Sequence, residues 1–142
     1  MMAQYLEFVA DHPFLFGAAA LVLAALIANE VVGHFTGGKR LTAFDAVRLI
    51  NDRDPLIVDV RPVADFKRGH LLNAFHAPLA KFDDYVGQLA KDKERPVIVY
   101  CALGSSSSTA ADKLKKSGFA EVYPLKGGIN AWQMANLPVT AK

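Results

Sequence analysis

The chain has 142 residues, of which 52% are hydrophobic and 21% charged, and it contains a single cysteine. That length allows one domain with one core plus an appendage, and the lone cysteine excludes an intrachain disulfide and a zinc site built from several thiolates. All 16 basic residues lie in residues 39–142, but they are scattered and often neighbour acidic residues, which argues against nucleic-acid binding.

An apolar segment over residues 13–35 predicts one membrane-spanning helix in contact with lipid. Phe14–Ala28 is uncharged but only about 22 Å long as a helix, short of a hydrocarbon layer of about 30 Å. Extension to Phe35 reaches the required length and leaves Glu30 near one end, where its carboxylate can approach the headgroups. Pro13 suits the first turn of this helix.

The flanking charges favour a membrane anchor whose globular domain faces the cytoplasm. A cleaved secretory signal would begin with basic residues, whereas residues 1–12 contain none. Lys39, Arg40 and Arg48 follow the span, which by the positive-inside tendency predicts a single-pass protein of the inner membrane. A signal sequence, or a hydrophobic hairpin docked on a partner, remains the alternative.

We therefore expect residues 1–38 to form the anchor with a short glycine linker, and residues 39–142 to form an α/β domain. Short apolar runs predict strands buried on both faces, at Leu56–Val60, Val97–Tyr100 and Glu121–Tyr123. Helical stretches alternate with them, at Thr42–Ile50 with Thr42 as the cap, Phe82–Leu89, Ser107–Ser117 and Ile129–Ala135. This alternation predicts a parallel sheet flanked by helices.

Cys101 directly follows the second apolar run and begins a small, polar loop that enters a helix. The carboxyl ends of parallel strands form the edge where ligands bind, so we expect the thiol to be presented there. Backbone N–H groups of the loop and the positive end of the helix would favour a thiolate. The loop consists of Ala102, Leu103, Gly104, Ser105, Ser106 and Ser107. From position alone, a lone cysteine after a strand is more often an inert core residue, but the small, glycine-containing loop favours a functional thiol.

Three ordered blocks of the sequence resemble the rhodanese family of sulfurtransferases. The first runs from Asp59-Val60-Arg61 through Asp65, Gly69-His70-Leu71 and His76 to Pro78, the second is the loop Cys101–Ser107, and the third runs from Gly118-Phe119 through Gly127-Gly128 to Trp132. The resemblance implies a rhodanese-like three-layer fold over residues 39–142. With the apolar leader, the chain is similar to bacterial membrane-anchored single-domain rhodanese-like proteins.

The resemblance implies that Cys101 takes a sulfane sulfur, carries it as a persulfide and passes it to a nucleophilic acceptor. The N–H groups of Ala102–Ser107 would cradle that sulfur, and a protein could serve as donor or acceptor. The persulfide would be a covalent intermediate, and no cofactor is expected. Loops that use thiosulfate commonly carry a basic residue at the positions of Ala102 or Ser106. We therefore expect weak activity with thiosulfate.

Several other patterns favour structural roles over chemical ones. Asp59, Arg61 and Asp65 are interpreted as supporting groups that pin loops together. His70 is expected to bond to the backbone, because four scattered histidines give no metal-ligand spacing. Ser107 or Ser108 is expected to cap the following helix, and Trp132 to lie in the core.

Two function classes remain after these exclusions. A cysteine phosphatase is excluded because its Cys-x5-Arg motif would place arginine where this chain has Ser107. The alternative to a sulfurtransferase is a catalytically idle or redox-sensing module that docks a partner at the membrane.

Overall fold

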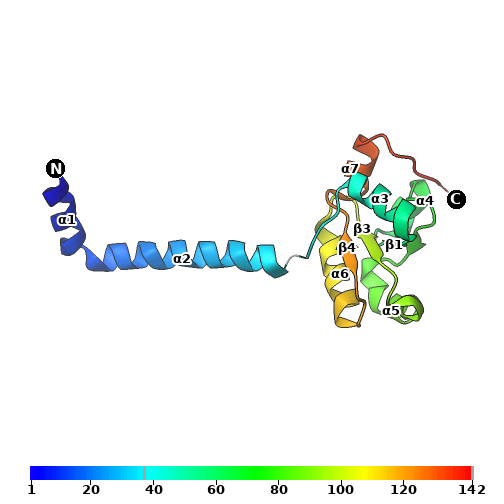
Figure 1. Ribbon diagram of the computed structural model, residues 1–142, viewed down its shortest axis with the longest axis horizontal. Coiled ribbons are helices and arrows are strands. Elements are labelled where there is room, and N and C mark those ends of the chain that lie inside the picture. Colours follow the sequence, from blue (N-terminus) through cyan, green and yellow to red (C-terminus); the bar gives the residue numbers. More distant parts are fainter. Residues whose placement is uncertain (37, 142) are drawn as a thin grey trace. The chain divides into compact units, whose positions relative to one another are not determined.

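The computed structural model describes residues 1–36 and 38–141, and it divides into two compact units, Met1–Gly37 and Gly38–Lys142. The first unit holds two helices, α1 (Met2–Asp11) and α2 (Pro13–Thr36) (Figure 1). The second unit holds every strand of the described chain and the remaining helices.

Helix α2 is long and apolar enough to cross a membrane. The stretch Pro13–Val32 has 20 residues and a mean hydropathy of 2.1, and none of it is buried. At 1.5 Å per residue this stretch is about 30 Å long, which matches a bilayer core. The helix begins at Pro13, as the sequence indicated. Helix α1 was not anticipated from the sequence, and it is joined to α2 by ring contacts of Phe8 with His12 and Phe16.

The second unit is a four-stranded parallel sheet in the order β2-β1-β3-β4, flanked by helices. Its strands are β1 (Leu56–Asp59), β2 (Phe75–His76), β3 (Val97–Tyr100) and β4 (Val122–Pro124). Its α-helices are α3 (Ala43–Arg53), α4 (Val63–Arg68), α5 (Phe82–Leu89), α6 (Ser105–Lys116) and α7 (Gly128–Met134). Two 3₁₀ turns, Leu79–Lys81 and Ala90–Asp92, flank α5.

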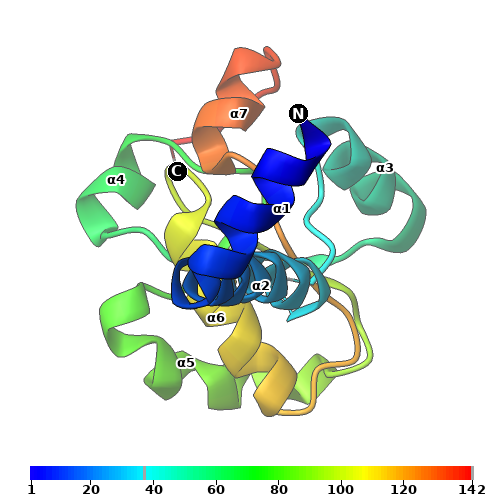
Figure 2. The same cartoon turned by 90° about the vertical axis from the view of Figure 1, so that its left-hand side faces the viewer.

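Side chains of β3 alternate between two cores, one on each face of the sheet. Val97 and Val99 pack with residues of α5 and α6, whereas Ile98 and Tyr100 pack with residues of α3 and α7. Figure 2 shows the same division, with α5 and α6 on one side and α3 and α7 on the other. All four residues of β3 are buried, which explains its unbroken apolar sequence. The three-layer α/β fold expected from the sequence is therefore confirmed.

The helix ends show where local chemistry differed from expectation. Thr42 caps α3 by accepting a hydrogen bond from the Asp45 N–H at 3.2 Å, as predicted. Helix α6 begins at Ser105, so the expected cap at Ser107 or Ser108 is wrong. Gly104 occupies the cap position with a φ of 102°, a left-handed conformation that turns the chain into the helix two residues earlier than the serine pattern suggested.

Candidate active site

Cys101 lies at the carboxyl end of β3, at the floor of a pocket of about 170 Å³. Cys101 is 5% exposed and also contacts the core on the α5 and α6 side of the sheet. One wall of the pocket comes from the segment after β1 and the other from the loop that Cys101 begins. The first wall contains Val60, Arg61, Pro62 and Asp65. The second wall contains Ala102, Leu103, Ser105 and Ser106. The thiol is thus nearly buried but adjoins open space.

Main-chain N–H groups of the loop are directed at the sulfur. The Gly104 N–H donates to Cys101 Sγ at 3.0 Å. Burial by itself raises the pKa of the Cys101 thiol, but hydrogen bonds from the N–H groups of Ser107, Gly104 and Leu103 outweigh burial and lower this pKa below its usual value. The surroundings of the sulfur therefore favour a thiolate.

Ser107 is fully buried beneath this loop and adds a side-chain donor to the backbone ones. Its hydroxyl contributes to the lowered pKa of Cys101, and it also donates to the Gly104 carbonyl at 3.0 Å. Ser107 therefore links the shape of the loop, through Gly104, to the charge on the sulfur.

Helix α7 braces the loop from behind, a contribution that the sequence analysis missed. The Ile129 N–H donates to the Cys101 carbonyl at 2.9 Å, and the Asn130 N–H donates to the Ala102 carbonyl at 3.2 Å. A Cβ atom on Gly128 would lie 2.3 Å from the Cys101 carbonyl oxygen, so only glycine fits this approach. In the sequence, Gly127-Gly128 was noted only as part of the third rhodanese-like block, although adjacent glycines can also signal a close backbone contact.

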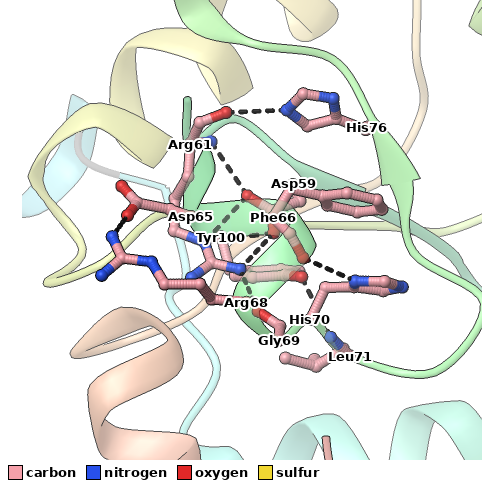
Figure 3. Close-up of polar contacts among 10 residues, drawn as sticks. All are labelled: Asp59, Arg61, Asp65, Phe66, Arg68, Gly69, His70, Leu71, His76 and Tyr100. Atoms are coloured by element: carbon pink, nitrogen blue, oxygen red, sulfur yellow. Dashed lines mark hydrogen bonds and ion pairs between the residues drawn. The ribbon is translucent and has the colours of Figure 1, made fainter. Parts of the chain in front are cut away.

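A buried ion pair fixes the opposite wall of the pocket. Arg61 donates from Nε and Nη2 to the Asp59 carboxylate, at 3.1 Å and 2.7 Å, and from Nη2 to the Gly69 carbonyl at 2.6 Å (Figure 3). The guanidinium also lies 5.6 Å from the centre of the Tyr100 ring. Burial, reinforced by Asp59, raises the pKa of Tyr100 far above its usual value, so this phenol stays protonated. Arg61 thus lines the pocket while its Nε and Nη2 donors are bonded to Asp59 and Gly69.

The segment after Arg61 is held by aromatic stacking. The Phe66 ring stacks on His70 and His76, with ring centres 3.8 Å and 4.5 Å apart. His70 Nδ1 lies 2.8 Å from the Phe66 carbonyl oxygen, which confirms the expected backbone bond, and His76 Nε2 lies 2.8 Å from the Arg61 carbonyl oxygen. Asp65 pairs with the exposed Arg68 rather than with Arg61 (Figure 3).

Within the part of the chain that the structure describes, no three His, Cys, Asp or Glu side chains are grouped as a metal site would require.

Comparison with known proteins places these features in a family. The sequence model of the rhodanese-like domain matches residues 42–135. The uncharacterized protein YibN of Escherichia coli (strain K12) is 35% identical over 139 residues, covering 97% of both chains. The thiosulfate sulfurtransferase GlpE of Coxiella burnetii (strain RSA 331 / Henzerling II) is 40% identical over 95 residues, which cover 67% of this chain and 87% of GlpE.

A solved structure shares the fold of the second unit. The crystal structure of a rhodanese-related protein from Thermoplasma volcanium matches with a TM-score of 0.66 and 23% identity, over 73% of this chain and 99% of that one. Both cores of the present domain also lie within its own unit, between residues 41 and 137. Residues 38–142 therefore have the contacts needed to fold without the leader.

Replacing Ser107 tests the hydrogen bonds to the sulfur. We expect Ser107→Ala to raise the pKa of Cys101, because one donor to the thiolate is lost. The rate of alkylation by iodoacetamide, followed against pH, reads this pKa directly since the chain has one cysteine. In the wild type the rate should rise at a lower pH than for a free thiol. Ser105→Ala, an exposed change in the same loop, is the control, and equal profiles for both variants would contradict the account.

Breaking the buried ion pair should destabilise the domain strongly. Arg61→Ala leaves the fully buried Asp59 carboxylate without its partner, a change that costs about 3–5 kcal/mol of unfolding free energy. Arg68→Ala removes an exposed arginine of a neighbouring pair and should cost less than about 1 kcal/mol. Urea unfolding of both variants measures the difference. Similar losses would show that the Asp59–Arg61 pair contributes no more than a surface pair.

Proposed function

The chain belongs to the rhodanese-like domain family, and on that premise we propose that it is a membrane-anchored sulfurtransferase carrying sulfane sulfur as a persulfide on Cys101. Relatives named as thiosulfate sulfurtransferases support sulfurtransferase activity at the level of the family. The observation that carries the proposal is the lowered pKa of Cys101, with the Gly104 N–H on its sulfur at the floor of a pocket.

The transfer needs two displacements at sulfur. The Cys101 thiolate attacks the outer sulfur of a donor R–S–SH, the donor S–S bond breaks, and R–S⁻ leaves as Cys101 becomes a persulfide. A nucleophilic acceptor then attacks the outer sulfur and restores the thiolate. Because a thiolate attacks without first losing a proton and the surroundings of Cys101 favour the thiolate, neither step requires a separate general base. We propose that the persulfide is a covalent intermediate and that no cofactor takes part.

The pocket has room and donors for the added sulfur. Its volume of about 170 Å³ exceeds the roughly 30 Å³ that one water occupies, so an extra sulfur and the end of a substrate fit. The N–H groups of Leu103, Gly104 and Ser107, with those of Ala102, Ser105 and Ser106 around the pocket, form the proposed cradle for negative charge on that sulfur.

We further propose that the physiological donor is a small or protein-borne persulfide and that thiosulfate is a poor donor. The loop carries no basic residue, and the charge of Arg61 is already paired with the fully buried Asp59 carboxylate. A doubly charged donor would therefore lack a charge-assisted partner, a loss of about tenfold or more in binding. A persulfide on a protein partner places less charge in the pocket.

The leader supports attachment to the inner membrane. We propose that residues 13–35 span the bilayer once and contact lipid, since Pro13–Val32 has the length and hydropathy of a span. Lys39, Arg40 and Arg48 after the span, against no basic residue before it, support a cytoplasmic domain. The sulfur would then be transferred at the cytoplasmic face.

Intact-mass measurement tests the persulfide directly. After incubation of residues 38–142 with glutathione persulfide, we expect a single addition of about 32 Da, the mass of one sulfur atom. Cys101→Ser should show no addition, and a thiol acceptor such as cysteine should remove it from the wild type. If the wild type takes up no sulfur from this donor, the idle or redox-sensing binding module becomes the better account.

A charge added to the loop should improve the use of thiosulfate. We expect Ser106→Arg to lower the KM for thiosulfate about tenfold in a thiosulfate:cyanide assay, because it supplies the missing charge-assisted hydrogen bond. Asn51→Arg, which adds the same charge at an exposed position of α3, should leave this KM unchanged. Fast wild-type turnover with thiosulfate, unimproved by Ser106→Arg, would contradict the donor preference.

A further inference from the structure

A second pocket, of about 540 Å³, lies at the amino ends of β1 and β3, the opposite end of these strands from Cys101. It adjoins Asp54 and Leu56 at the start of β1 and Arg95 just before β3. Its size falls in the range of about 300–1,000 Å³ that is typical of small-molecule sites. Nothing in the sulfur chemistry of Cys101 requires this pocket.

The walls of this pocket are largely aliphatic and aromatic. Helix α3 contributes Val47 and Ile50, β1 contributes Leu56, and α7 contributes Trp132. The Trp132 N–H donates to the Pro138 carbonyl at 3.0 Å, so its polar atom is satisfied and the indole presents apolar surface. Walls of this kind suit a hydrocarbon chain.

The C-terminal segment closes one side of the pocket and is itself held in place. Leu137 and Pro138 line the pocket, and the Thr140 and His70 backbones exchange hydrogen bonds at 2.7 Å and 2.8 Å. Leu72, which follows shortly after His70, is 67% exposed and also lines the pocket. A ligand chain would cover this exposed leucine, and that burial would favour binding.

Arg95 supplies the one positively charged group among the described residues that line this pocket, whose other polar lining residues are Asp54 and Asn73. Its Nε donates to the Asp54 carbonyl at 2.6 Å and its Nη2 to the Asp54 carboxylate at 3.1 Å, but that carboxylate is 93% exposed. Its Nη1 lies 3.9 Å from the Asp92 carboxylate, beyond hydrogen-bond distance. The Nη1 donors can therefore bind an acceptor on a ligand.

We propose that this pocket binds a medium-chain carboxylate, with its hydrocarbon chain against Val47, Ile50 and Trp132 and its carboxylate on Arg95. The apolar walls select the chain, and the guanidinium selects the charged head. This site is separate from the sulfur site in residues and in chemistry, and it does not depend on the proposed sulfurtransferase function.

Trp132 is the only tryptophan of the chain, so it reports on this pocket alone. A bromine atom quenches indole fluorescence on contact, and 11-bromoundecanoate is therefore a suitable probe. The experiment uses residues 38–142 with Cys101→Ser, so that the bromide cannot alkylate the thiol, and probe concentrations below micelle formation. We expect saturable quenching of Trp132, and about tenfold weaker binding of 11-bromoundecanol, which lacks the charged head.

Variants distinguish the binding of the carboxylate by Arg95 from the binding of the hydrocarbon chain by the apolar walls. Arg95→Gln should weaken binding of the carboxylate about tenfold, whereas Arg53→Gln, a change at an exposed arginine paired with Glu121, should leave it unchanged. Ile50→Phe should fill the pocket and abolish saturable quenching. Leu72→Asp, at an exposed position that does not risk the fold, should weaken binding of both probes.

The proposal is overturned by any of three results. These are the absence of saturable quenching, undiminished quenching in a folded Ile50→Phe variant or in Leu72→Asp, or equal affinity for the acid and the alcohol. Circular dichroism of each variant establishes that it is folded before the titration.

Discussion

The structure depends on the direction in which the peptide groups after Cys101 point. The carbonyls of Cys101 and Ala102 accept hydrogen bonds from α7, and the N–H groups of Leu103, Gly104 and Ser107 are left to stabilise the sulfur. Burial opposes ionisation of the thiol, so the thiolate is favoured only because several donors act together. If the loop turned the other way, the same buried cysteine would be an inert core residue.

The parallel sheet explains why this arrangement can be held firmly. β3 is buried and paired on both sides, so Cys101 leaves the sheet at a fixed position. The neighbouring strand β1 delivers Asp59 and Arg61 to the same end of the sheet, where their ion pair holds the facing wall. The opposite ends of these strands border the apolar pocket beside Trp132. One sheet thus separates two sites of different chemistry.

The sequence predicted the elements that have a recognisable pattern of apolar or capping residues within one continuous segment. The predicted apolar strands correspond to β1 and β3. The prediction of the Thr42 cap and of Cys101 directly after a strand was also correct. Strand β2 has two residues and α4 has six, which are too short to produce a periodic pattern. The start of α6 was missed because the φ of Gly104, rather than a serine side chain, determines it.

The parts of the site that escaped prediction depend on contacts between distant segments. Gly128 approaches the Cys101 carbonyl only after the chain has returned from β4, and a pair of glycines can signal a close backbone contact but not which segment makes it. Asp65 and Arg61 are close in sequence, yet Asp65 pairs with Arg68 because Asp59 already holds Arg61. The apolar pocket likewise combines α3, α7 and the C-terminal segment.

Amide proton shifts measured by NMR across a pH titration of residues 38–142 test the central claim most directly. The account predicts that the N–H signals of Leu103, Gly104 and Ser107 move together, at one midpoint below the usual pKa of a thiol, and that Cys101→Ser abolishes this movement. A midpoint above the usual thiol pKa would contradict this prediction. So would N–H signals that do not shift when the sulfur ionises.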